Sequence, residues 1–436
     1  MVRYEFNQGV QKLKSKTKIV LSTVGLGATG VAMALVLPLG ANADVSGPTC
    51  SVAPSGADYS TIQAAVNATG CTTINVAPGV YNENVVIGHT LTLNGAQAGH
   101  AVSGRTAANP LTESTVSGVT NGTAAISIRA ANVTVDGFSV TNSLPLFSAT
   151  GIGVKTAGND AVITNNIIDT INTADTGGNG TAQAVYLEGG PDGVSITNNQ
   201  MSNIHSNRSA KAVLVGDNGA TNTPNDTTIQ GNSMTNITSD ARGAYGVAVG
   251  NPNPSTGGVT GLQVLDNTIG NLTGGWVHAI GLEGNTPNVV ITGNTISNLV
   301  SATPDAIAVW FESNSSFSTA QVHTNNFNVA APTYGIAVHP ALTEGSVSGT
   351  CNYWNSPSGP TATSNLGGTG AQVSSNVTYS PWLIASAPLG DCFGGNVPAS
   401  KDQCKKDGWM TRVRTDGSTF KNQGDCVSYV ATGGRH

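Results

Sequence analysis

Short segments in which apolar and polar residues alternate recur along the chain at similar intervals. Seven of them carry a β-branched or apolar run, then Asn, then another apolar residue within two positions. The seven asparagines are Asn166, Asn199, Asn232, Asn267, Asn294, Asn325 and Asn352. Their intervals are 33, 33, 35, 27, 31 and 27 residues. Alternating segments rich in Val, Ile and Thr are typical of β-strands, and units of this length bury their apolar faces by stacking. The pattern predicts a solenoid of strands.

A second apolar phrase precedes each Asn phrase and completes the repeat. It occupies residues 151–154, 184–187, 212–215, 246–249, 279–282, 306–309 and 335–338. Each repeat thus supplies at least two short strands with a turn between them, which predicts one coil of a parallel β-helix. Stacked coils lie about 4.8 Å apart. An Asn that recurs at one turn is expected to form an internal amide ladder. Outward amides that bind sugar hydroxyls are the alternative.

The residues before the first coil predict a cap for the open end of the solenoid. In the segment 58–69, Ile62, Ala65 and Val66 fall on one face of a short helix. Ser60 or Thr61 is placed to cap the N-terminus of that helix. We therefore expect an amphipathic helix that covers the end of the apolar core.

The next segment resembles a known family. Residues 72–96, TTINVAPGVYNENVVIGHTLTLNGA, with TIQAAV before them, resemble the opening coil of the pectin lyase-like β-helices, particularly of pectin methylesterases. The ending NYWNSPSGP (352–360) resembles the closing coil of secreted or surface β-helix repeat proteins. The resemblance implies an all-β, right-handed, single-stranded parallel β-helix of about eight to ten coils within residues 44–390.

The catalytic motifs of that family have no counterpart in this chain. The D-F-I-F-G segment of pectin methylesterases and the W-x-D-H phrase of pectate lyases are absent, as is the calcium repeat G-G-x-G-x-D. Between residues 124 and 355 the only arginines are Arg129, Arg208 and Arg242, and none stands beside an acidic cluster in register. We therefore expect no cofactor and no metal site, and no catalytic set is carried over from the family.

Residues 1–43 predict an export segment. Four lysines between positions 12 and 18 precede an apolar run over 19–39, and A-N-A (41–43) follows it. This order is typical of a signal peptide that is cleaved before Asp44. An uncleaved membrane anchor is the alternative, because the run is long enough to span a bilayer. The protein is expected to be secreted or at the cell surface, with membrane contact only through this segment.

The net charge of the chain indicates which classes of ligand it is expected to bind. Residues 1–43 hold 5 of the 18 Lys and Arg and 1 of the 24 Asp and Glu, so the remaining chain has a formal charge of −10. Nucleic acids and anionic membranes are bound through basic patches, and neither is the expected partner. A charged fraction of 10% with 55 glycines suits an extended surface of small polar residues. We expect a monomer that contacts a polysaccharide or a cell-surface glycan.

All six cysteines lie outside residues 72–350. An even number of cysteines in an exported chain favours disulfides. Sequence proximity suggests the pairs Cys50–Cys71, Cys351–Cys392 and Cys404–Cys426, and other pairings stay open. Residues 391–436 lack a coil phrase. Within them, residues 404–436, with the elements C-K-x-x-G-W and F-K-N-Q-G-x-C-V, resemble a short Cys-containing C-terminal module of exported bacterial proteins. We expect a separate module there, either for sorting or wall contact or as a stapled cap.

Aligning the second phrases places outward side chains in columns along the solenoid. The position before each phrase holds Thr150, Gln183, Lys211, Tyr245, His278, Asp305 and Tyr334. The position after each phrase holds Lys155, Glu188, Gly216, Gly250, Glu283, Trp310 and His339. The last three coils are the richest in functional groups, and their aromatic side chains are suited to stacking on sugar rings. The candidate ligand-binding residues are Tyr245, Trp276, Trp310, Tyr334 and His339.

A catalytic pair is harder to assemble from these columns. A glycosidase needs two carboxyl groups about 5 to 9.5 Å apart. Glu188 and Glu283 are too far apart because three coils separate them, and Glu283 and Asp305 are too far apart because they lie five positions from each other along the strand. The remaining carboxylate pair is Glu283 with Glu312. His278 beside Asp305 is the remaining dyad, in which the carboxylate orients a general base; a solvated surface pair is the alternative. The candidate catalytic residues are His278, Asp305, Glu283 and Glu312.

The missing catalytic motifs and the low charge favour a non-enzymatic protein. We expect its lateral face to bind carbohydrate or to mediate surface contact. The alternative is a polysaccharide lyase or glycoside hydrolase that acts on an extracellular polysaccharide through the region of His278, Glu283, Asp305 and Glu312.

Overall fold

The computed structural model describes residues 48–434 apart from 144–146, 174–179, 217–221, 251–257, 314, 316, 344, 395–396 and 415–417. The export segment predicted at residues 1–43 lies outside the described residues. Among the described residues, no helix has both the length and the apolar character needed to cross a membrane.

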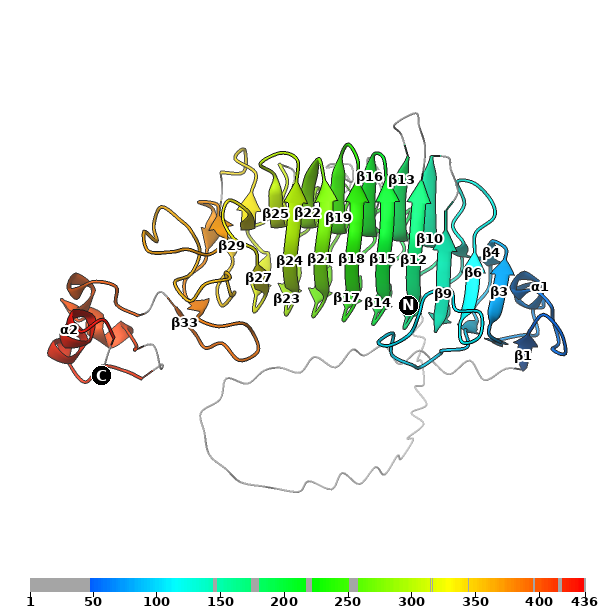
Figure 1. Cartoon of the computed structure of the whole chain (residues 1–436), viewed down its shortest axis with the longest axis horizontal. Coiled ribbons are helices and arrows are strands. Elements are labelled where there is room, and N and C mark those ends of the chain that lie inside the picture. Colours follow the sequence, from blue (N-terminus) through cyan, green and yellow to red (C-terminus); the bar gives the residue numbers. More distant parts are fainter. Residues whose placement is uncertain are drawn as a thin grey trace, which may run out of the picture. The chain divides into compact units, whose positions relative to one another are not determined.

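Three parallel sheets run along the length of a solenoid (Figure 1). Sheet A contains, in spatial order, β1 (Thr49–Val52), β2 (Thr73–Val76), β5 (Thr92–Asn94), β8 (Thr134–Asp136), β11 (Val162–Thr164), β14 (Ser195–Thr197), β17 (Thr228–Gln230), β20 (Gln263–Leu265), β23 (Val290–Thr292), β26 (Gln321–His323), β29 (Val347–Ser348) and β31 (Val377–Thr378). Sheet B contains β3 (Gly79–Asn82), β6 (Ser114–Ser117), β9 (Phe138–Asn142), β12 (Ile167–Thr173), β15 (Gln200–Ser206), β18 (Ser233–Ser239), β21 (Thr268–Gly274), β24 (Thr295–Ser301) and β27 (Asn326–Asn328). Sheet C contains β4 (Val85–Ile87), β7 (Ile126–Ile128), β10 (Ser148–Val154), β13 (Thr181–Leu187), β16 (Ser209–Val215), β19 (Gly243–Val249), β22 (Trp276–Leu282), β25 (Ala306–Phe311), β28 (Tyr334–Val338) and β30 (Gln372–Val373).

Each regular coil contributes one strand to each sheet, and neighbours within a sheet come from successive coils. The predicted all-β, parallel β-helix is confirmed. The sequence predicted at least two strands per repeat, and the structure has three, because each Asn phrase spans two strands. In the first such phrase, β11 ends at Thr164, Asn166 turns the corner, and β12 begins at Ile167. Because the corner occupies only two residues, the sequence pattern does not separate the strand before it from the strand after it, and predicts one strand.

The recurring asparagines form a continuous ladder inside this corner. All seven are at most 1% exposed. The Oδ1 atom of Asn199 accepts the backbone N–H of Asn166 at 2.9 Å and its side-chain Nδ2 at 3.1 Å. The same two bonds, at 2.9–3.0 Å, link every later pair of asparagines up to Asn352. The predicted structural ladder is confirmed, and these amides do not face a ligand.

The ladder continues one coil beyond the asparagines. Phe138, which stands where later coils have Asn, donates its backbone N–H to Asn166 Oδ1 at 2.9 Å. Each ladder amide also donates to a backbone carbonyl of the preceding coil, as Asn232 does to Ile196 at 2.8 Å. Buried backbone groups that a tight corner leaves without a ladder partner are thereby satisfied.

The core between the sheets consists of apolar side chains stacked in register. In sheet C one column runs from coil to coil with no exposed area: Ile152, Val185, Val213, Val247, Ile280, Val309 and Ile336. Burying one such side chain contributes about 1.5–3 kcal/mol. Stacking therefore supplies the stability that a single coil lacks.

The N-terminal end is closed by α1 (Ile62–Asn67), as predicted. Thr61 caps the helix by accepting the Ala64 N–H at 3.3 Å, and the Glu83 carboxylate accepts the N–H groups of Ile62 and Gln63 at 2.9 and 2.8 Å. The side chains predicted to face the core, Ile62, Ala65 and Val66, are buried. A disulfide joins Cys50 of β1 to Cys71.

At the other end, β32 (Trp382–Leu383) pairs antiparallel with β33 (Cys392–Gly394), and a disulfide joins Cys351 to Cys392. The remaining chain forms η1 (Lys401–Cys404), η2 (Gly408–Thr411) and α2 (Gln423–Ala431) around its own small core, stapled by Cys404–Cys426. All three proposed disulfide pairs are confirmed. The domain boundary at residue 390 stays a prediction.

We predict that Asn232→Ala destabilises the protein strongly. It removes the acceptor of two Asn199 donors and the donor to the Ile196 carbonyl. Each buried polar group left without a partner costs about 1–3 kcal/mol, so the free energy of unfolding should fall by roughly 2–5 kcal/mol. Denaturant unfolding followed by circular dichroism measures this change.

The matched control is Asn121→Ala. Asn121 is exposed, and its side chain makes no hydrogen bond within the described residues, so its substitution should change stability by less than about 0.5 kcal/mol. Equal losses in the two variants would contradict a structural role for the ladder.

Candidate ligand-binding site

The register of sheet C differs from the sequence alignment at one strand. Ile280 of β22 pairs with Val309 of β25, and Leu282 pairs with Phe311. The phrase equivalent to 279–282 is therefore 308–311, so the alignment with 306–309 was wrong by two residues. β25 is an unbroken apolar run, AIAVWF. A shift of two residues keeps every side chain on the same face, and the pattern could not distinguish the two registers.

The corrected register redefines the rows on the face of sheet C that points away from the core. The central row contains Thr150, Gln183, Lys211, Tyr245, His278, Ile307 and Tyr334. The next row contains Gly153, Tyr186, Leu214, Ala248, Gly281, Trp310 and Ala337. Asp305 thus lies outside the row of His278, and Trp310 lies outside the row of Glu283. In the row of Glu283, the residue on the next coil is Glu312.

Four aromatic and imidazole rings form a continuous series across this face. The ring centroids are 5.6 Å apart for Tyr245 and His278, 5.5 Å for His278 and Trp310, and 5.9 Å for Trp310 and His339. Trp276 joins the series by donating its indole N–H to the Tyr245 hydroxyl at 2.7 Å. Four of the five predicted ligand-binding residues therefore lie together. Tyr334 lies in the central row beside Ile307 and has no ring contact among the described residues.

The predicted contact between His278 and Asp305 is present, although it runs diagonally between rows. His278 Nε2 lies 3.1 Å from Asp305 Oδ1. The other ring nitrogen, Nδ1, is buried and has no hydrogen-bond partner in the described part of the chain. The histidine is 4% exposed between Tyr245 and Trp310. Nε2 is bonded to Asp305 and Nδ1 is buried. Neither nitrogen is therefore open to a substrate as a general base.

The two carboxylates left by the sequence analysis occupy the same row on adjacent coils. Glu283 and Glu312 follow β22 and β25 in register, about 4.8 Å apart along the stack. The Glu283 carboxylate accepts the Tyr245 hydroxyl at 3.0 Å. Partial burial acts to raise the pKa of Glu312, but bonds from the Ser313 amide and the Trp310 indole, with His339 3.7 Å away, hold this pKa below its usual value. A general acid needs the opposite shift.

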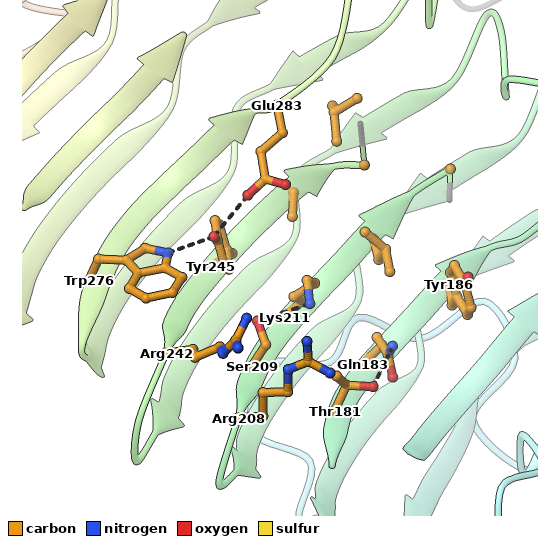
Figure 2. Close-up of a pocket in the computed structure, with 15 residues that line it drawn as sticks. Thr181, Gln183, Tyr186, Arg208, Ser209, Lys211, Arg242, Tyr245, Trp276 and Glu283 are labelled. Carbon is orange, nitrogen blue, oxygen red and sulfur yellow. Dashed lines mark hydrogen bonds between the residues drawn. The ribbon is translucent and has the colours of Figure 1, made fainter. Parts of the chain in front are cut away.

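A cavity of about 330 Å³ opens on the same face beside the ring series (Figure 2). Leu214 and Ala248, which follow Tyr186 in their row, line it together with Gly216 and Gly250, which directly follow β16 and β19. Polar and charged groups line the rest: Thr181, Gln183, Arg208, Ser209, Lys211, Arg242, Trp276 and Glu283.

Tyr245 belongs to the ring series and also lines the cavity. Two glycines make room for its ring: a Cβ at Gly243 would lie 2.3 Å from Tyr245 Cε2, and one at Gly281 would lie 3.0 Å from the same ring. Burial, with the negative charge of Glu283, raises the pKa of the Tyr245 phenol far above its ordinary value. The phenol therefore stays neutral and donates to Glu283.

Lys211 is the basic residue of the cavity whose pKa is shifted by its surroundings. Its Nζ donates to Ser209 Oγ at 3.1 Å and lies 5.7 Å from the centroid of the Tyr245 ring. Burial lowers the pKa of the Lys211 amine to about 8, Arg208 acts in the same direction, and Glu283 opposes them. The amine is cationic at neutral pH and loses its proton in mildly alkaline solution.

Lys211 falls in one of the predicted outward columns, but the sequence pattern assigns neither Lys211 nor Arg208 and Arg242 to a site. A signal for them existed: Arg208 and Arg242 immediately precede Ser209 and Gly243, the first residues of β16 and β19. Two arginines at equivalent positions on adjacent coils, with Lys211 following, mark one spot on the solenoid surface. Among the described residues, no group of three or more His, Cys, Asp or Glu side chains is placed to hold a metal ion.

Comparison with models of protein families found no match, and a search of curated proteins also found none. Among solved structures the chain is similar to the Dettilon tailspike protein, with a TM-score of 0.39 and 14% sequence identity. The similarity covers 73% of this chain and 62% of that one, so the chain spans less than two thirds of that protein. The fold assignment rests on the three parallel sheets themselves.

We predict that Tyr245 does not ionise in the native protein at pH values where exposed tyrosines do. Because its pKa is raised, an alkaline titration of tyrosinate absorbance to about pH 11 should be the same for wild type and Tyr245→Phe. Circular dichroism at each pH confirms that the chain stays folded. A smaller absorbance change in Tyr245→Phe would show that the phenol ionises normally and that it is not held as described.

Proposed function

We propose that this protein is an exported, non-catalytic β-helix protein that binds carbohydrate on the outer face of sheet C. The observation that carries the proposal is the ring series Tyr245, His278, Trp310 and His339 beside the cavity. Aromatic side chains that keep a polar edge are suited to stacking on sugar rings while they bond to hydroxyl groups.

The scaffold supports this proposal by its regularity. Rows of side chains repeat at about 4.8 Å along a straight face, so an extended polysaccharide can contact several coils at once. The cavity lies at the low end of the range of small-ligand sites, about 300–1,000 Å³. Its hydroxyl, amide and charged groups, such as Thr181, Gln183 and Glu283, are the kinds of partners that sugar hydroxyls use.

The case against catalysis rests on two groups. His278 has neither ring nitrogen open to a substrate, and the pKa of Glu312 is shifted away from the range of a general acid. The competing proposal is a polysaccharide lyase or glycoside hydrolase. One observation favours it, since Glu283 and Glu312 occupy adjacent coils in one row, close to the carboxylate separation of a retaining glycosidase, about 5–5.5 Å.

Export is supported by covalent structure. The described residues contain three disulfides and no free cysteine, and such bonds persist in oxidising compartments outside the cytosol. N-terminal sequencing of secreted protein tests the cleavage before Asp44 expected from residues 1–43.

A glycan array followed by product analysis separates the two proposals. Binding without new reducing ends and without unsaturated uronides is the expected result. Release of either product by the wild type, with loss of release in Glu312→Gln, would establish an enzyme and contradict the non-catalytic proposal.

We predict that Trp310→Ala weakens binding of the glycan found on the array by about tenfold, the loss expected for one aromatic contact of about 1–1.5 kcal/mol. Isothermal titration calorimetry measures the affinity. Leu111→Ala is the control, because Leu111 is 84% exposed on the loop before β6, outside sheet C; it should leave affinity unchanged. Unchanged affinity in Trp310→Ala, His278→Ala and Asp305→Ala alike would place the binding site elsewhere.

A further inference from the structure

We propose that the cavity on β13, β16, β19 and β22 binds the anionic group of an acidic sugar residue, a carboxylate or a sulfate, through Arg208, Lys211 and Arg242. The inference rests on the proposed carbohydrate-binding function and adds to it the charge of the ligand. It is carried by the placement of basic residues in an otherwise acidic chain.

Basic residues are scarce in the solenoid and concentrate at this cavity. Residues 44–390 contain six Lys and Arg side chains: Arg105, Arg129, Lys155, Arg208, Lys211 and Arg242. Three of the six line one cavity. Like charges so close together repel one another, and such a cluster is stabilised when an anion lies between them.

Two of the other three basic residues are used for structure, while Arg129 is exposed. Arg105 forms a buried ion pair with Glu113 at 2.7 Å, and Lys155 pairs with Glu188 on the next coil. Within the described residues, by contrast, Arg208, Lys211 and Arg242 form no ion pair. The acid at the cavity rim, Glu283, is bonded to the Tyr245 hydroxyl instead. The three cations therefore retain their capacity for an anionic ligand.

The backbone fixes both arginines at the cavity rim. The buried hydroxyl of Ser206 accepts the Arg208 backbone N–H at 3.1 Å, and that of Ser239 accepts the Arg242 backbone N–H at 3.0 Å. Ser206 and Ser239 pair in register in sheet B, so the two arginines leave equivalent corners of adjacent coils. Figure 2 shows both guanidinium groups directed toward the same hollow as Lys211. Guanidinium groups donate in a planar fork that matches carboxylate and sulfate oxygens.

The rest of the cavity is suited to the sugar that would carry the anion. Trp276 and Tyr186 stand on either side of the basic cluster, and Gln183, Ser209 and Thr181 supply uncharged polar groups. Because the chain without residues 1–43 has a formal charge of −10, its long-range field does not attract polyanions such as nucleic acids. The positive charge is local and fits a single acidic residue.

Matched ligand pairs test the proposal directly. The probes are a hexuronate oligosaccharide with its carboxyl-reduced counterpart, and a sulfated oligosaccharide with its desulfated counterpart. Calorimetry at low salt should show that at least one anionic member binds about tenfold or more tightly than its neutral partner, since a bond to a charged group contributes about 1.5–3 kcal/mol. Which pair shows the difference identifies the anion as carboxylate or sulfate.

Variants of the two arginines localise the effect. Arg208→Gln and Arg242→Gln should each weaken binding of the anionic ligand by about tenfold and leave the neutral ligand unchanged. Arg129→Gln is the matched control, because it removes the same charge from an exposed position outside the cavity; it should change neither affinity. Circular dichroism checks that each variant is folded.

The pH dependence of the affinity for the anionic ligand tests the role of Lys211. The groups that face its amine are Gln183, Ser209, Arg208, Arg242, Tyr245 and Glu283. With a pKa of about 8, the amine is charged at pH 7 and neutral well above pH 8, while both arginines stay charged. Affinity for the anionic ligand should therefore fall as pH rises through about 8 in the wild type, and should be flat over the same range in Lys211→Met.

The outcomes distinguish this inference from the proposed function. Equal affinity for anionic and neutral partners, or equal losses in Arg242→Gln and Arg129→Gln, overturns the anion site while glycan binding itself stands. Absence of binding to both members of every pair and across the array overturns both.

Discussion

The buried amide ladder is the interaction on which the rest of this structure depends. From β11 to β27, each coil turns the corner between sheets A and B in two residues, and a corner that short leaves backbone groups without partners inside the protein. The asparagines from Asn166 to Asn352 satisfy those groups and at the same time tie each coil to the next. A buried amide that bonds both upward and downward tolerates no slip between coils, because a displaced coil would leave several polar groups unsatisfied.

Fixed register has a consequence for the surface. Since each coil is held to its neighbours, every outward side chain acquires a defined row and height, and a site can be built by changing residues on a few coils without altering the scaffold. On sheet C, large rings on β22 and β25 make a stacking surface, while the cavity beside it includes Gly216 and Gly250, which directly follow β16 and β19. Gly243 and Gly281 show that the backbone is matched to one side chain, because both positions accommodate the Tyr245 ring.

The sequence predicted the architecture well because the fold repeats the same physical solution. Asn232 or Ile196 alone carries little information, but their recurrence at fixed positions indicates strands, corners and an inward ladder. The cap at Thr61 and the three disulfides followed from local capping preferences and from cysteine proximity. The site was predicted less well. In the run AIAVWF both registers are equally apolar, so Trp310 was assigned to the row that belongs to Glu312. The burial of His278 Nδ1 and the convergence of Arg208 with Arg242 depend on side-chain packing, which has no periodic signal.

The central claim is that the outer face of sheet C is a binding surface for an acidic glycan. A crystal structure of the protein with a bound acidic oligosaccharide tests it most directly. The account predicts density for sugar rings along sheet C between Tyr186 and Trp310, with the anionic group against Arg208, Lys211 and Arg242. Sugar bound on sheet A, on sheet B or on residues 401–431, with this cavity empty, would contradict it.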